Sequence, residues 1–149
     1  MLPPLNDDGN LPPGIHSATW EEVIERFGRN SHRLKLLEGV RQVLHLLRAA
    51  GCQKAYLDGS FVTRKHTPVD FDLCWDEKEV DEAALAPIFL DFTQRCAAQK
   101  RRFGGEIYPA NAPGGIGGWA YLDFFQRCKR TGRAKGILAL DLIEWPEDF

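Results

Sequence analysis

The sequence lacks the closely spaced cysteines and histidines that zinc sites and dithiol chemistry require. Its four cysteines contain no Cys-x-x-Cys pair, and its four histidines contain no His-Glu-x-x-His motif. These absences argue against a zinc enzyme, and we expect four free thiols that are buried or half-buried. The cysteines are Cys52, Cys74, Cys96 and Cys128.

Long hydrophobic runs are also missing. The longest apolar stretch, Gly136 to Ile143, is short and is interrupted by Asp141, so no segment reaches the length of a membrane span. The first residues lack the basic and apolar blocks of a signal peptide. We therefore expect a cytoplasmic protein.

What is present is an ordinary globular composition with an uneven distribution of charge. Of 149 residues, 44% are hydrophobic and 27% charged, which fits a single domain. The net charge is only -2, but basic residues far outnumber acidic ones between Arg95 and Lys135, and acidic residues gather between Asp70 and Glu82. Each cluster by itself is consistent with solvated helix ends. Together they are consistent with a phosphate-attracting face opposite a metal-attracting face.

The order of the expected elements favours an α/β (α+β) fold, in which helices pack on a small mixed sheet. Residues 1–18 are rich in proline and are expected to form an extended arm, and residues 19–149 a single domain. Helices are expected at 20–27, from Asn30 or Ser31 to about Gly51, from Asp81 to about Lys100 with a restart at Pro87, and from Trp119 or Tyr121 to Lys129. Strands are expected at 54–57, 69–75, 106–108 and 136–143. The glycine-rich stretch 113–118 is expected to be a loop.

The most informative stretch joins a Gly-Ser turn to an Asp-x-Asp strand. Gly59 and Ser60 follow the first of these strands, and Asp70 and Asp72 come after nine intervening residues, 61–69. Glycine lets the backbone approach phosphate oxygens, and the serine hydroxyl adds a donor. Side chains alternate along a strand, so Asp70 and Asp72 are expected on one face, where they can share hard divalent cations.

This pattern resembles the nucleotidyltransferase superfamily of the DNA polymerase beta type, and more narrowly its small bacterial minimal members. The match covers about Tyr56 to Trp75. The resemblance implies a nucleotidyltransferase-like core and Mg²⁺-dependent transfer of a nucleoside monophosphate from a triphosphate (NTP). Gly59 and Ser60 would lie at the phosphates, and Asp70 and Asp72 would bind two magnesium ions. It further suggests a toxin-antitoxin or phage-defence setting.

A third carboxylate normally completes such a site as metal ligand or base. Glu106, at the start of the strand after the long helix, is the favoured candidate, and Asp141 on the last strand is the alternative. The sequence departs from the family at Asp58, where an apolar residue is usual, and at Thr63, where an arginine is common. Asp58 is either a turn residue at the strand end or a charge that repels a triphosphate. Arg64 or Lys65 is then the expected cation at the phosphates.

Two functions from different classes follow. The first is a nucleotidyltransferase that modifies a macromolecular hydroxyl, either at the 3′ end of transfer RNA or on a side chain of a partner protein. The second is a nucleotidyltransferase-like module that has lost turnover and acts as a protein partner or antitoxin. One domain leaves no room for a separate acceptor-binding domain, so we expect acceptor choice to come from the arm, the glycine loop, the basic C-terminal third or another subunit.

Overall fold

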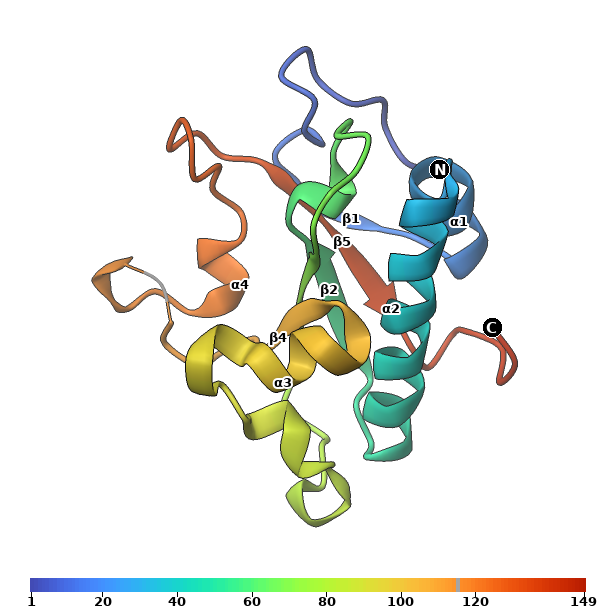
Figure 1. The fold of residues 1–149 in the computed structure, drawn as a ribbon, viewed down its shortest axis with the longest axis vertical. Coiled ribbons are helices and arrows are strands. Elements are labelled where there is room, and N and C mark those ends of the chain that lie inside the picture. Colours follow the sequence, from blue (N-terminus) through green and yellow to red (C-terminus); the bar gives the residue numbers. More distant parts are fainter. Residues whose placement is uncertain (115) are drawn as a thin grey trace.

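The computed structural model describes residues 1–114 and 116–149. In this part of the chain five strands form one mixed sheet with the order β1-β5-β2-β3-β4 (Figure 1). β1 runs parallel to β5 and β3 parallel to β4, whereas β2 is antiparallel to both of its neighbours. The expected α/β fold is confirmed. The strands are β1 (Gly14–Ser17), β2 (Lys54–Asp58), β3 (Phe71–Trp75), β4 (Gly105–Pro109) and β5 (Gly136–Asp141).

Helices cover both faces of the sheet (Figure 1). α1 (Trp20–Phe27), α2 (Ser31–Ala49) and α3 (Thr93–Phe103) pack on one face and form the main core with Leu57, Leu73 and Leu138. The short helix α4 (Tyr121–Phe124) lies on the other face. A smaller cluster there contains Cys74, Ala110, Phe125 and Ile137.

The sequence accounts for the ends of the first two helices. Thr19 and Glu22 form the capping box of α1, and the Asn30 side chain accepts a hydrogen bond from the Arg33 N–H at the start of α2. Gly51 follows α2 with a φ of 99°, a conformation that favours glycine. The buried face of α2 includes Leu37, Val40, Leu44 and Leu47. At the start of the helix the fully buried residue is Arg33, whereas Leu34 is 48% exposed.

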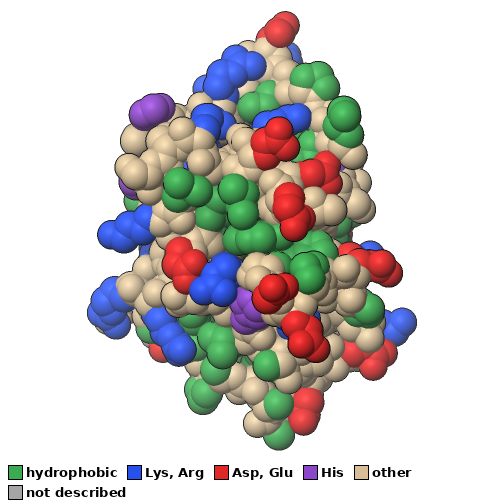
Figure 2. All heavy atoms as spheres, turned by 90° about the vertical axis from the view of Figure 1, so that its right-hand side faces the viewer, with side chains coloured by type: hydrophobic (Ala, Val, Ile, Leu, Met, Phe, Trp, Pro, Cys, Tyr) green, Lys and Arg blue, Asp and Glu red, His purple; other side chains and the backbone are tan. Residues whose placement is uncertain are grey.

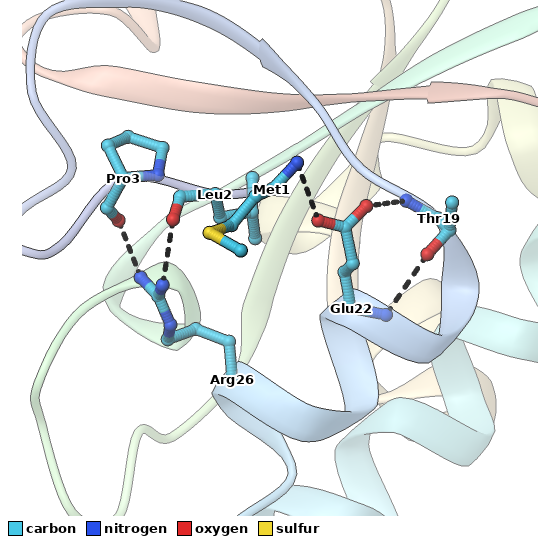
Figure 3. Close-up of polar contacts among 6 residues, drawn as sticks. All are labelled: Met1, Leu2, Pro3, Thr19, Glu22 and Arg26. Carbon is cyan, nitrogen blue, oxygen red and sulfur yellow. Dashed lines mark hydrogen bonds and ion pairs between the residues drawn. The ribbon is translucent and has the colours of Figure 1, made fainter.

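The N-terminal segment is built into the domain at several points. Gly14–Ser17 forms the edge strand β1, and Leu2 and Leu11 are buried in the core. Figure 3 shows Arg26 donating to the carbonyl oxygens of Pro3 and Leu2 at 2.7 and 3.0 Å. In the same view Glu22 accepts from the Thr19 N–H at 3.0 Å and pairs with the Met1 amine at 3.3 Å.

Several element boundaries differ from the sequence-based expectation. Residues 81–100 form two 3-10 turns, Glu82–Ala84 and Pro87–Leu90, before α3 begins at Thr93. Ala86 is extended because it precedes a proline. α4 ends at Phe124 rather than Lys129, since the chain turns back and pairs Arg127 with Ala134. β3 begins at Phe71, which leaves Val69 80% exposed.

The outer surface of the layer that contains α1 and α2 mixes residue types. Figure 2 shows a band of hydrophobic side chains between groups of charged ones on this side. Ile24 of α1 and Leu34 of α2 are exposed large hydrophobic residues. Over the described residues no helix is long and apolar enough to cross a membrane. The glycine-rich stretch expected to be a loop contains a 3-10 turn at Ile116–Gly118, and Gly115 lies outside the described residues.

Candidate functional site

A cavity of about 610 Å³ opens beside the end of β2. Its walls come from the segment that joins β2 to β3, from the N-terminal arm at Asp8 to Asn10, and from residues 124–135. Six of the residues predicted from the sequence line it together: Gly59, Ser60, Arg64, Lys65, Asp70 and Asp72. Tertiary structure therefore brings both halves of the motif to one cavity.

Gly59 is required by its contact with Asp72. Its φ is 84°, in the region that favours glycine. A Cβ atom at this position would lie 2.7 Å from Oδ2 of Asp72 and 3.1 Å from its backbone nitrogen. The missing side chain thus lets the end of β2 pack directly against the Asp-x-Asp strand.

Three carboxylates form a row across neighbouring strands. Asp72 on β3 stands opposite Asp58 on β2 and opposite Glu106 on β4, so all three side chains lie on the same face of the sheet. Asp70 directly precedes β3. Asp141 pairs with Lys54 at the other end of β2, roughly 13 Å along the strand from Asp58 at about 3.3 Å per residue. Glu106, not Asp141, therefore neighbours Asp72, although it is outside the cavity lining.

The row is only partly neutralised. Both carboxylate oxygens of Asp58 accept hydrogen bonds from Lys135 Nζ, at 2.9 and 3.1 Å. Glu106 pairs with Lys100 at 3.4 Å. Asp72 is 7% exposed, and its Oδ1 has no hydrogen-bond partner among the described residues. Burial, together with the charges of Asp58 and Glu106, raises the pKa of Asp72 to about 8. Burial also raises the pKa of Asp70, and the negative charge of Glu106 raises it further.

The segment between the two motif halves is held by a buried arginine. Arg33 donates to the carbonyl oxygens of Phe61 at 2.6 Å, Thr63 at 2.9 Å and Lys65 at 3.1 Å, and to that of Phe27 at 3.1 Å. Its guanidinium also lies 5.1 Å from the centre of the Phe61 ring. Burial lowers the pKa of Arg33 to about 10, so it keeps its charge at neutral pH. Arg33 therefore fixes the backbone that carries Arg64 and Lys65.

The arm adds a second support to this segment. The Arg64 N–H donates to the Gly9 carbonyl at 3.0 Å, and the Arg64 side chain donates to the Asn6 carbonyl at 3.1 Å. The Thr63 hydroxyl donates to the Ser60 carbonyl at 2.6 Å. Thr63 thus supports the turn, while Arg64 and Lys65 line the cavity.

The opposite wall is strongly basic. Arg127, Lys129, Arg130 and Lys135 line the cavity, and they all come from the basic stretch noted in the sequence. Cys128 lies among them, and hydrogen bonds from Thr131 lower the pKa of its thiol to about 7. The other three cysteines are buried, and all four are free thiols as expected. A phosphate-sized anion would therefore meet cations on two walls of the cavity.

Sequence reasoning did not find the roles of Arg33 and Lys135. Arg33 continues the buried stripe of α2 toward the N-terminus at the spacing of Leu36, Leu37 and Val40, which is a signal that could have located it. Lys135 pairs with a carboxylate 77 positions away in the chain. No local pattern indicates that pairing.

A scan against protein-family models matches residues 3–141 to one family. The chain belongs to DUF6932, a family of unknown function. No curated protein and no solved structure matches the chain. The function proposed for this DUF6932 protein therefore depends on its own site.

The donor set of the cavity fits a hard divalent cation in part. No group of three histidine, cysteine or acidic side chains in the described ranges is arranged to hold a metal ion. Mg²⁺, however, is usually bound by one or two carboxylates together with substrate phosphates and water. Asp72 presents a buried oxygen to which no described residue donates a hydrogen bond, and Asp70 lines the same cavity. A divalent cation would supply the positive charge that balances this buried carboxylate oxygen.

Proposed function

We propose that this DUF6932 protein is a cytoplasmic Mg²⁺-dependent nucleotidyltransferase that moves a nucleoside monophosphate from an NTP to a macromolecular hydroxyl. The observation that carries the proposal is the meeting of Gly59 and Ser60 with Asp70 and Asp72 in one cavity with basic walls. A metal-bound triphosphate needs three kinds of group: a glycine-serine backbone beside its phosphates, oxygen ligands for the metal, and basic side chains that neutralise its charge.

In this proposal each wall of the cavity has its own task. Asp70 and Asp72 hold the cation, which when bound supplies charge stabilisation to the reacting phosphate. Gly59 and Ser60 lie against the phosphates, and Arg64 and Lys65 neutralise them from one side. The basic wall neutralises the leaving group and steers anions to the cavity. Glu106, beside Asp72, remains the predicted third carboxylate.

The proposed reaction is an in-line displacement at the α-phosphorus. The acceptor oxygen forms a bond to that phosphorus while the bond from the phosphorus to the bridging oxygen of the β-phosphate breaks. Pyrophosphate leaves, and a carboxylate of the site takes the proton of the hydroxyl. The acceptor is the 3′ end of an RNA such as transfer RNA or a side chain of a partner protein, in a toxin-antitoxin or phage-defence system.

Label transfer tests the proposal. The purified protein is incubated with Mg²⁺, each α-labelled NTP, total RNA and a cell lysate, and the labelled band identifies the acceptor. We expect the double variant Asp70→Asn and Asp72→Asn to lose labelling, because it keeps the shape of the site but loses the ligand charges. Asp141→Asn is the matched control, since its carboxylate lies at the other end of β2, and it should label normally. Labelling by the double variant at the wild-type level would refute the assignment.

The second candidate function is the binding module without turnover. Asp58 favours it, because the ion pair that Asp58 forms directly before Gly59 uses Lys135, a cation of the cavity wall that would otherwise neutralise phosphates. Thermal unfolding with Mg²⁺ and each NTP separates the two candidates. A ligand at a hundred times its dissociation constant stabilises the folded protein by about 2.7 kcal/mol, whereas no shift with any nucleotide favours the module.

A further inference from the structure

We propose that Asp58 is a ligand of the divalent cation together with Asp70 and Asp72, and that Lys135 neutralises Asp58 only while the cation is absent. This inference rests on the cation site of the proposed function and adds a residue to it. The third carboxylate ligand is then Asp58, on β2 directly before the Gly-Ser turn, rather than Glu106 on β4.

The sheet register places Asp58 beside Asp72, whose Oδ1 has no hydrogen-bond partner in the described part of the chain. Asp58 and Asp72 are directly opposite residues of antiparallel strands, and the Cβ atoms of such pairs lie about 4.5–5.5 Å apart. Both residues line the cavity, as does Asp70. A cation held against Asp72 Oδ1 therefore has Asp58 within reach without movement of the backbone.

Glu106 is the weaker candidate for this role. It is equally close to Asp72 in register, but it does not line the cavity. Its side chain is 21% exposed and pairs with Lys100 on α3, whereas the Asp58 side chain is 2% exposed. Of the two carboxylates that flank Asp72, Asp58 is the one that faces the space where a metal and a nucleotide would bind.

Lys135 has the position of a replaceable counter-ion. Its ammonium contacts both oxygens of Asp58, so these oxygens are occupied, and Asp58 is not available to complete a group of ligands. Lys135 directly precedes β5 and lines the cavity, so its flexible side chain has open space to move into. A divalent cation carries twice the charge of an ammonium and satisfies Asp58 and Asp72 at once, whereas Lys135 serves Asp58 alone. Once displaced, the ammonium points to the space proposed for the phosphates.

The test measures Mn²⁺ binding by the full chain without nucleotide, using electron paramagnetic resonance of free Mn²⁺. The main variant is Asp58→Asn with Lys135→Met, which removes both members of the pair and leaves no unpaired buried charge. The matched control is Glu38→Gln with Arg41→Met, which removes an ion pair on α2 that does not line the cavity. We expect the main variant to weaken Mn²⁺ binding by about tenfold to a hundredfold and the control to bind like the wild type. Equal binding by the main variant and the wild type, loss of binding in the control instead, or no binding by the wild type would overturn the inference.

A single variant tests the displaced lysine in the opposite direction. Lys135→Met removes the competitor of the cation, so we expect tighter Mn²⁺ binding and a larger rise of the melting temperature with Mn²⁺ than in the wild type. An unchanged Mn²⁺ affinity would overturn the inference even if the double variant does not fold. Label transfer is scored separately: Asp58-dependent Mn²⁺ binding without labelling would refute the proposed function and leave this site standing. Normal labelling with Mn²⁺ binding that is independent of Asp58 would do the reverse.

Discussion

Replacing Arg33 by methionine should destabilise the protein through the segment that carries the phosphate-binding residues. Methionine keeps an unbranched apolar stem in a fully buried position but removes every hydrogen bond to the carbonyl groups of Phe27, Phe61, Thr63 and Lys65. The change therefore tests whether these hydrogen bonds, rather than the packing of the stem, hold the segment.

The magnitude follows from which carbonyl groups lose a donor. Thr63 and Lys65 keep the weaker hydrogen bonds from Arg29, at 3.2 and 3.3 Å, whereas Phe27 and Phe61 lose the donation from Arg33. A buried acceptor without a partner costs about 1–3 kcal/mol, so the two together cost about 2–6 kcal/mol. The variant no longer has to bury a charge, which offsets part of this cost. We expect a net loss of about 2–4 kcal/mol.

Urea unfolding followed by tryptophan fluorescence measures this loss. A domain of this size has a stability of about 5–15 kcal/mol, so the variant should still fold. With an m-value of about 2 kcal/mol per M, the midpoint should fall by about 1–2 M. Amide hydrogen exchange should also become faster from Phe61 to His66, because local opening there becomes easier.

Arg29→Met is the matched control. Arg29 donates to two of the same carbonyl groups but is exposed, so its loss should cost less than about 1 kcal/mol. Arg33→Lys should be intermediate, since an ammonium cannot reach four carbonyl groups as a guanidinium fork does. Equal midpoints for Arg33→Met and the wild type, or unchanged amide exchange from Phe61 to His66, would show that these hydrogen bonds do not hold the segment.

Two further predictions concern titration. Because the pKa of Asp72 is raised from 3.8 to about 8, the folded protein keeps a proton that the unfolded chain releases between these pH values. Its contribution to stability therefore falls as pH rises through this window, by up to about 1.4 kcal/mol per pH unit without divalent cation. Asp72→Asn should flatten the pH dependence in urea unfolding, and identical slopes would contradict the assignment. The lowered pKa of Cys128 predicts fast alkylation by iodoacetamide with a midpoint near pH 7, while the buried cysteines react slowly. Peptide mass mapping measures both rates, Cys128→Ser should remove the fast phase, and a buried thiol such as Cys52 reacting as fast would contradict the prediction.

Local patterns allowed much of the fold to be predicted. The capping box of Thr19 and Glu22 and the glycine after α2 mark helix ends by backbone hydrogen bonding, which acts over a few residues. The prediction of one helix restarted at Pro87 was wrong. Ala86 is extended and separates the two 3-10 turns there. Asp91 accepts hydrogen bonds from the Thr93 N–H and hydroxyl, and α3 begins only after this turn. In such a stretch the local signals for a helix and for turns compete, and tertiary packing decides which of the two structures forms.

The two halves of the candidate site could be recognised from local sequence alone. The Gly-Ser turn and the Asp-x-Asp strand are each defined by residues one or two positions apart, so short-range geometry is enough to recognise them. The folded structure was needed to show that both halves line one cavity, that Glu106 and not Asp141 neighbours Asp72, and that Lys135 pairs with Asp58. It also placed Arg33 beneath the segment between the two halves. These arrangements depend on strand order and register, which join residues far apart in the chain and leave no periodic signal in the sequence.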